Sequence, residues 1–318
     1  MTPQFVEQLA TDFDDVFFLI GAAILAIEIV KGLFSPSFRW RGFLDMIASI
    51  STQIPSLLAE IFLLSLAYLG YVLIADSLVG WTFPITVWTI LLGVIACDFF
   101  YYWEHRIAHR VRLFWTQHAV HHSSRYMNTS VAIRFGPLEG VLSALAHLPL
   151  IFLGFPPSVV LFGIFFVLAY QTWIHTELIG RLGFLDAILN TPSNHRVHHG
   201  CDDKYIDKNY GGILIVWDRL FGTYQREEET PRYGLKRDFE AVNPLIVWIS
   251  ELPQFFRDLK NARSPREFWM HLFGPPGWAP ESDADTGKTS NSGLAEARTV
   301  SPAPPAPLPN SARQRSAP

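Results

Sequence analysis

A chain of 318 residues with 49% apolar and only 17% charged residues carries fewer charges than an average soluble protein. This composition argues against disorder, a coiled coil and a purely soluble enzyme, and it favours a membrane anchor with a sizeable water-facing part. The net charge of −4 and the lack of a long basic run argue against nucleic acid as a partner. Two cysteines are too few for a disulfide framework.

The N-terminal third of the chain predicts membrane-spanning helices. Apolar stretches cover residues 16–30, 43–75 and 83–103, and the cleanest part of the second stretch is residues 61–74. Basic residues follow the first and third stretches and are absent before the first and between the second and third. The positive-inside rule therefore predicts an outside N-terminus and a cytoplasmic histidine-rich region. The acidic start of the chain argues against a cleaved signal peptide.

Two further patterns follow in the second half of the chain. Residues 138–173 are apolar but are broken at residues 154–157, which predicts a helical hairpin that enters and leaves the membrane on one side. Residues 243–260 carry an apolar stripe with a period of about 3.6 residues, which begins after a suitable N-cap, Asn243. This stripe predicts an amphipathic helix that lies either on the bilayer surface or on the catalytic domain.

These patterns predict an all-α protein, a polytopic membrane helical bundle with a cytoplasmic, histidine-rich di-metal domain. Residues 1–82 form the N-terminal transmembrane helices, residues 83–225 the catalytic domain and residues 226–276 an amphipathic extension. Residues 277–318 are rich in Pro, Ala, Ser and Gly without an apolar period, and they predict a disordered tail. The alternative is a soluble protein in which some apolar stretches are core helices.

The histidines carry the chemistry that the sequence predicts. Histidines three or four residues apart on a helix share one face, and one helical turn can bring two of them onto one metal ion. One ion takes about four to six ligands, so the clusters predict two ions. Nitrogen ligands suit zinc, copper, nickel and iron, and a two-metal site at a membrane surface favours iron for O2 activation. The predicted ligands are His105, His109, His118, His121, His122, His175, His195, His198 and His199.

Two acidic residues near these clusters are candidate catalytic groups. Asp98 lies two helical turns before His105 inside an apolar stretch, where a carboxylate is costly and usually functional. We expect it to accept a hydrogen bond from a histidine or to bind metal weakly, with pairing to an arginine as the alternative. Glu177 follows His175 by two residues, and it is expected to orient an imidazole or relay a proton, or else to be a surface carboxylate.

The order HxxxH, HxxHH and, after a hydrophobic hairpin, a second HxxHH resembles the fatty acid hydroxylase / sterol desaturase family of membrane di-iron enzymes. The likeness covers residues 85–225 and includes the downstream runs at 171–177, 189–200 and 205–224. Within this family the chain is most similar to the alkylglycerol monooxygenase group and its bacterial members. The resemblance implies an all-α membrane fold, a non-haem di-iron centre held by the boxed histidines, and O2-dependent oxidation of a lipid C–H bond.

For the alkylglycerol monooxygenase group, the resemblance also implies hydroxylation next to an ether oxygen with tetrahydrobiopterin as the reductant. Asn194 and Arg110 depart from the pattern of that group. These departures bear on the pterin and on the ether-lipid substrate, and they leave the metal ligands intact. The sequence contains no GxGxxG motif and no haem or iron–sulfur ligand set, so an external electron donor is expected.

The predicted function is therefore a membrane-bound di-iron monooxygenase that hydroxylates a lipid with O2. Desaturation of a sterol or an acyl lipid shares the first hydrogen abstraction and is the alternative among enzymes. A membrane metal carrier is the alternative of another class, although apart from Asp98 and a few amides the spans offer no hydrophilic path. The expected location is a multi-pass position in the inner membrane of a bacterium or the endoplasmic reticulum of a eukaryote.

Overall fold

The computed structural model describes residues 1–34 and 40–280. Within these residues the secondary structure is helical and contains only two isolated β-bridges, which confirms the predicted all-α class. The disordered tail predicted for residues 277–318 lies, from residue 281 on, outside the described residues.

Four helical segments are long and apolar enough to cross a membrane, so the chain is a membrane protein. They are Pro3–Leu33, Ile61–Val79, Val87–Arg110 and Pro157–Ile174. The first is helix α1 (Pro3–Leu33), which includes the predicted stretch 16–30. The second is the end of helix α2 (Trp40–Ile74) together with the short π-helix η1 (Ala75–Val79).

Helix α3 (Val87–Arg110) is longer than the apolar stretch that predicted it. It begins at Thr86, whose hydroxyl accepts a hydrogen bond from the backbone N–H of Thr89 and so satisfies a free donor of the first turn. It continues past residue 103 without a break, so His105 and His109 extend from the end of a spanning helix. The rigid helix thus fixes both imidazoles relative to the bundle.

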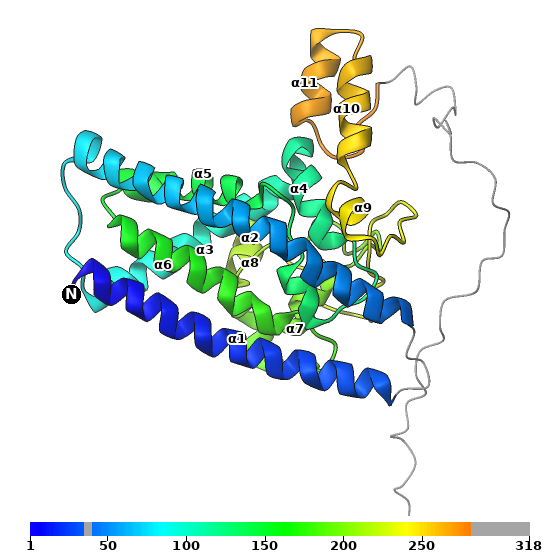
Figure 1. Ribbon diagram of the computed structural model, residues 1–318, viewed down its shortest axis with the longest axis horizontal. Coiled ribbons are helices and arrows are strands. Elements are labelled where there is room, and N and C mark those ends of the chain that lie inside the picture. The colour runs from blue at the N-terminus through cyan, green and yellow to red at the C-terminus, as the bar shows by residue number, and fades with distance from the viewer. Residues whose placement is uncertain (35–39, 281–318) are drawn as a thin grey trace, which may run out of the picture. The chain divides into compact units, whose positions relative to one another are not determined.

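The predicted hairpin is present as helices α5 (Glu139–Phe152) and α6 (Pro157–Tyr170), which are joined at residues 153–156. Figure 1 shows α6 between α1 and α3, and α2 alongside α5. The approach of α3 to α6 is close, because a Cβ atom on Gly163 would lie 2.5 Å from Sγ of Cys97, and one on Gly93 would lie 2.4 Å from Cγ1 of Val159. Small residues at such crossings allow helix backbones to pack tightly in a membrane.

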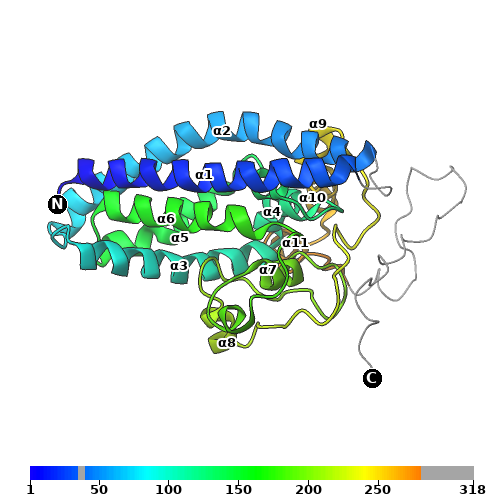
Figure 2. The same ribbon diagram turned by 90° about the horizontal axis from the view of Figure 1, so that it is seen from below.

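Several short elements lie toward one end of the bundle, as Figure 2 shows for α4 and α7, and α8 packs beside α3. Helix α4 spans Arg112–His122, α7 spans Pro192–His198 and α8 spans Val216–Phe221. Three 3-10 turns lie between them, at η2 (Thr129–Ile133), η3 (Gln171–Ile174) and η4 (Gly183–Ala187). This end of the bundle carries all three histidine clusters.

The amphipathic stretch 243–260 is two helices and not one, which corrects the prediction. Helix α9 (Pro244–Trp248) begins after Asn243, whose side chain caps it as expected. Helix α10 (Leu252–Asn261) begins anew with Pro253 in its first turn. A proline cannot continue a helix without losing a backbone hydrogen bond and clashing with the preceding turn, so it separates the two segments. A third helix, α11 (Pro265–Phe273), follows.

Candidate metal centre

Nine buried histidines lie together, and they come from α3, α4, α7 and the turn after η3. Their ring nitrogens form two groups, and within each group the candidate ligand atoms lie within 4.8 Å of one another. The first group is His105, His109, His118, His122 and His198. The second group is His121, His175, His195 and His199. The structure thus brings together every histidine that the sequence proposed as a ligand.

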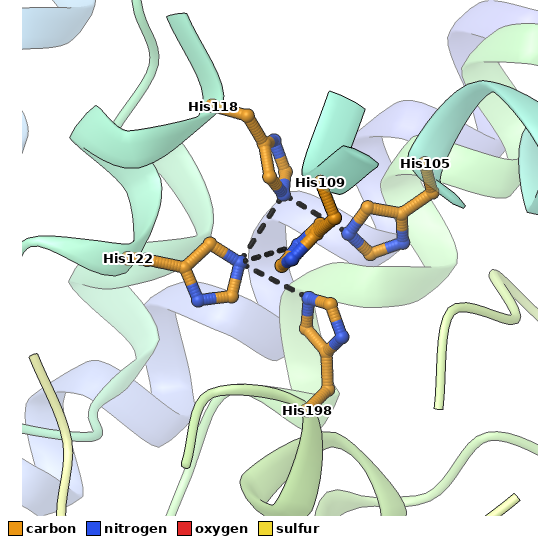
Figure 3. A group of neighbouring side chains, drawn as sticks. All are labelled: His105, His109, His118, His122 and His198. Carbon is orange, nitrogen blue, oxygen red and sulfur yellow. Dashed lines mark hydrogen bonds between the residues drawn. The ribbon is translucent and has the colours of Figure 1, made fainter. Parts of the chain in front are cut away.

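In the five-histidine group the rings point toward a common centre, as Figure 3 shows. Nε2 of His122 lies 3.2 Å from Nε2 of His118 and 3.1 Å from Nε2 of His109. It also lies 3.1 Å from Nε2 of His198. Nε2 of His105 is 3.0 Å from Nε2 of His118. The same nitrogen of every ring therefore faces inward.

The four-histidine group has the same arrangement. Nε2 of His175 lies 3.2 Å from Nε2 of His121 and 2.8 Å from Nε2 of His195. Nε2 of His199 is 3.1 Å from Nε2 of His195. The two groups adjoin, because the rings of His122 and His199 stack with their centroids 4.5 Å apart.

These spacings fit ligands of a transition metal. A bond from zinc to an imidazole nitrogen is about 2.0–2.1 Å long, so two ligands at right angles on one ion lie about 3.0 Å apart. The inward nitrogens of neighbouring rings lie between 2.8 Å and 3.2 Å apart. An all-imidazole donor set suits zinc, copper, nickel and iron. The two histidine groups could therefore bind metal.

Backbone carbonyl groups fix the outer nitrogen of several rings. When Nδ1 carries the proton, it donates to the backbone, which leaves the lone pair of Nε2 for a metal. Nδ1 of His105 lies 2.8 Å from the carbonyl oxygen of Tyr210, and Nδ1 of His198 lies 3.0 Å from that of Lys208. Nδ1 of His175 lies 2.7 Å from the carbonyl oxygen of Gln171. The tautomer needed for metal binding is thus set by the fold.

A carboxylate takes the place of the carbonyl at His118. Oε1 of Glu139 lies 2.5 Å from Nδ1 of His118, while its Oε2 accepts a hydrogen bond from the backbone N–H of Gly136. A carboxylate that accepts the outer N–H of a ligating histidine orients the ring and raises its basicity. Glu139 was not among the residues proposed from the sequence, because it lies at the start of α5, remote from every histidine box along the chain.

The loop that supplies the carbonyl groups of Lys208 and Tyr210 has an unusual backbone. Asp207 and Asn209 adopt left-handed conformations, with φ of 60° and 57°, which residues other than glycine rarely adopt. The buried carboxylate of Asp218 holds the loop by accepting hydrogen bonds from the backbone N–H groups of Tyr210 and Gly211, at 2.8 and 2.7 Å. The surrounding contacts therefore determine a backbone that is unfavourable in isolation.

Burial favours the neutral form of several imidazoles outside the spanning segments. It lowers the pKa of His198 to about 3 and that of His175 to about 4. For His122, His195 and His199 the pKa lies well below its usual value, first because the rings are buried and then because neighbouring imidazoles repel a positive charge. A neutral ring is the form that binds a metal ion.

Asp98 does not contact a histidine in the structure, which corrects the expectation for this residue. Its buried carboxylate accepts hydrogen bonds from the backbone N–H groups of Ile213 and Leu214, at 2.6 and 3.1 Å. It accepts a third from the indole N–H of Trp217, at 2.8 Å. These bonds explain how a carboxylate is tolerated inside α3, and they tie the 213–217 segment to that helix.

Among the described residues, Glu177 also makes its hydrogen bond to Tyr233 and not to a candidate metal-binding nitrogen. It is an exposed residue, and its Oε1 accepts a hydrogen bond from the hydroxyl group of Tyr233 at 3.2 Å. Within the described residues, its recorded hydrogen bond is to a tyrosine and not to an imidazole. The surface position, which was the alternative for this residue, agrees with the structure.

Two buried ion pairs brace the histidine segments. Arg196 forms a bidentate pair with Glu227, at 2.7 and 2.8 Å, and also donates to backbone carbonyl groups in the segment after His175. Arg134 pairs with Asp45 of α2 at 3.0 Å and donates to the carbonyl oxygen of Val120, directly before the His121–His122 pair. Both arginines act on residues distant in sequence, so no local pattern could have predicted their partners.

Comparison with known proteins gives a family match over this region. Residues 90–223, which include all nine histidines, match the sequence model described as fatty acid hydroxylase. The chain is 40% identical to the alkylglycerol monooxygenase of Homo sapiens over 240 residues, which are 74% of this chain and 53% of that protein. It is 38% identical to the alkylglycerol monooxygenase of Danio rerio over 285 residues, 87% of this chain and 60% of that protein.

A bacterial relative also matches. The ornithine lipid hydroxylase OlsE of Rhizobium tropici is 31% identical over 188 residues, 58% of this chain and 54% of that protein. The chain thus spans between about half and three fifths of the length of these relatives. No solved structure is significantly similar to the chain.

Proposed function

We propose that the chain is a membrane-bound, non-haem di-iron oxygenase of the fatty acid hydroxylase family that hydroxylates a lipid C–H bond with O2, since its residues 90–223 match the sequence model of that family. The observation that carries this proposal is the convergence of nine buried imidazoles into groups of five and four at the end of an apolar helical bundle. The similarity to two alkylglycerol monooxygenases and to a lipid hydroxylase supports hydroxylation as the reaction.

We assign one iron ion to each histidine group, and a pair of iron ions would supply the redox chemistry of O2 activation. The inward Nε2 atoms of the two groups would hold these ions. Glu139 orients His118, and the carbonyl groups of Tyr210 and Lys208 orient His105 and His198. Burial lowers the pKa of His175 and of His198, which favours the neutral, metal-binding form of these two rings.

The substrate class follows from the setting of the site. The histidines continue from spanning helix α3 and from α6 through η3, so a reacting chain atom must come from a molecule whose tail lies among apolar helices. A lipid meets this requirement. Ether lipids are the first candidates, since two relatives are alkylglycerol monooxygenases, and an acyl chain of a polar lipid is the second. The electron donor is external, with tetrahydrobiopterin as the first reductant to test.

The orientation in the membrane is part of the proposal. Lys31 follows the apolar part of α1, and Arg106, Arg110 and Arg112 lie at the end of α3 or just beyond it. Basic residues favour the cytoplasmic side, so the histidine groups would face the cytoplasm and the N-terminus the outside. A headgroup could then approach the site from the cytoplasmic leaflet.

The decisive experiment compares the lipids of cells with and without the gene and measures the metal in the purified protein. A lipid that gains one oxygen, together with about two iron ions per chain, supports the proposal. A lipid that loses two hydrogens instead supports a sterol or acyl-lipid desaturase. Metal uptake without any lipid change supports a metal carrier. Replacement of His198 by Ala serves as the control, because it removes an inward nitrogen of the five-histidine group.

A further inference from the structure

Helices α10 and α11 form a hairpin that Arg112 attaches to the rest of the chain. The guanidinium group of Arg112 donates to Asp258 of α10, and its Nη1 lies 3.0 Å from Nδ1 of His271 in α11. The backbone N–H of Arg112 donates to the carbonyl oxygen of Gly274 at 3.0 Å. Arg112 follows α3 by two residues, so the hairpin is attached at the level where a candidate membrane span ends.

The helices of the hairpin run in the direction expected for helices that lie on a membrane surface. Figure 1 shows α10 and α11 crosswise to the long helices α1 and α2. In the perpendicular view of Figure 2 the hairpin lies behind the bundle at the same end. Helices that run crosswise to the spanning helices, at the depth where a span ends, lie parallel to a bilayer surface.

The hairpin exposes four aromatic side chains. Phe256, Phe268, Trp269 and Phe273 are between 40% and 60% exposed, and the rings of Trp269 and Phe273 stack with centroids 5.5 Å apart. The inward side is already occupied, because Phe255 and His271 are buried against α4 and Arg112. Tryptophan and phenylalanine favour the boundary between headgroups and acyl chains.

Basic side chains accompany the aromatic face. Arg257, Lys260 and Arg266 are exposed within ten residues of one another. Of the nearby acids, Asp258 pairs with Arg112, and Glu267 accepts a hydrogen bond from the backbone N–H of Arg263 at 2.8 Å. The outer surface of the hairpin is therefore cationic and complements anionic lipid headgroups.

Apolar side chains are also exposed on α9 and on the first half of α2. Helix α9 packs on α2, and its Leu245 and Ile246 are exposed, as is Ile249 directly after it. Ile47 and Ile50 are exposed on α2 itself. A surface that is apolar on α2 is thus extended by α9 toward the hairpin.

We propose that α9 and the α10–α11 hairpin form a membrane-surface collar, in which the aromatic side chains enter the headgroup boundary and the basic side chains bind anionic phospholipids. The collar lies on the leaflet at the histidine end of the bundle. It goes beyond the proposed function, because it depends on the chain spanning a membrane and not on iron, O2 or the identity of the substrate.

The test uses the full chain in vesicles of phosphatidylcholine, alone or mixed with phosphatidylglycerol. In a Cys201→Ser background, Trp269→Cys is labelled with an environment-sensitive fluorophore, and Asn261→Cys, on the polar side of α10, is the matched control. Lipids with a spin label near the headgroup serve as quenchers. The collar predicts blue-shifted, quenched emission at position 269 and unquenched emission at position 261.

Charge reversal tests whether the basic side chains bind anionic phospholipids. Lys260→Glu combined with Arg266→Glu should reduce the quenching at position 269 in vesicles that contain phosphatidylglycerol, and the difference between the two lipid mixtures should disappear. Equal emission at positions 269 and 261 would overturn the collar. Quenching at position 269 that appears only at high protein density would also overturn the collar, because it indicates that a second copy of the chain covers this surface. The same holds if shielding of position 269 is lost when the chain ends at residue 280, because the C-terminal segment would then be what covers it. Metal content is measured on every variant, so failure of the collar is distinct from failure of the proposed function.

Discussion

Oε1 of Glu139 lies 2.5 Å from Nδ1 of His118, and the opposite nitrogen of the same ring faces the other histidines of its group. Glu139 begins α5, whereas His118 belongs to α4, so the contact links the hydrophobic hairpin to the histidine centre. A change in the hairpin can therefore reach a metal-binding nitrogen through one hydrogen bond.

This contact predicts the effect of Glu139→Gln. The amide retains the shape of the side chain but removes the negative charge that orients and polarises His118. Loss of such a carboxylate typically weakens metal binding by about 10–100-fold. Competition with a chelator measures the affinity, and Glu240→Gln at an exposed ion pair with Arg41 is the control. Equal affinity in Glu139→Gln and the unaltered protein would contradict this role.

Asp218 should act on only one of the two groups. Its carboxylate holds the loop whose carbonyl groups orient His105 and His198, and both of these belong to the five-histidine group. In Asp218→Asn an amide N–H group would face a backbone N–H, so the loop should lose its left-handed conformation. The expected result is selective loss of metal from that group, with bound metal falling from about two ions toward one ion per chain.

Metal analysis after dialysis against a chelator measures this loss. The matched control is Asp202→Asn, since Asp202 also accepts from a backbone N–H but pairs with Arg232 at the surface. Equal loss of both ions in Asp218→Asn would indicate general unfolding and would contradict a selective role.

The parts of the site that local spacing determines could be predicted from the sequence. Residues three or four apart share a helix face, so HxxxH and HxxHH alone indicated that His105 and His109, or His118 and His122, could meet. The break within the amphipathic stretch also has a sequence signal, since Pro253 lies in the first turn of the second helix.

The contacts that orient these histidines could not be predicted in the same way. A backbone carbonyl such as that of Lys208 or Tyr210 has no residue-type signature, and its position depends on the loop conformation. Asp98 illustrates the same limit. Its residue type and apolar surroundings predicted a histidine, a metal ion or an arginine as its partner, whereas the fold supplies Trp217 and two backbone groups.

The Arg196–Glu227 pair predicts a large stability effect. Both side chains are nearly inaccessible, at 7% and 10% exposure. Arg196→Met leaves the Glu227 charge buried without its partner, which typically costs about 3–5 kcal/mol. Denaturant unfolding in detergent measures the loss. The double variant Arg196→Met with Glu227→Leu should recover part of it, because no charge then remains unpaired. A double variant as unstable as the single one would mean that the bonds of Arg196 to backbone carbonyl groups dominate.

The neutral imidazoles predict how the metal-free protein responds to pH. Burial lowers the pKa of His175 to about 4 and that of His198 to about 3, whereas an unfolded chain has histidine pKa values near 6.5. Between these values the unfolded state binds more protons than the folded state, so the free energy of unfolding falls as the pH falls. Thermal unfolding of the metal-free protein, followed from about pH 7 to about pH 5, should therefore show a decreasing midpoint. Bound metal should stabilise the folded state and raise the midpoint throughout this range, because it binds the neutral rings. A midpoint independent of pH in the metal-free protein would contradict the buried, neutral state of these histidines.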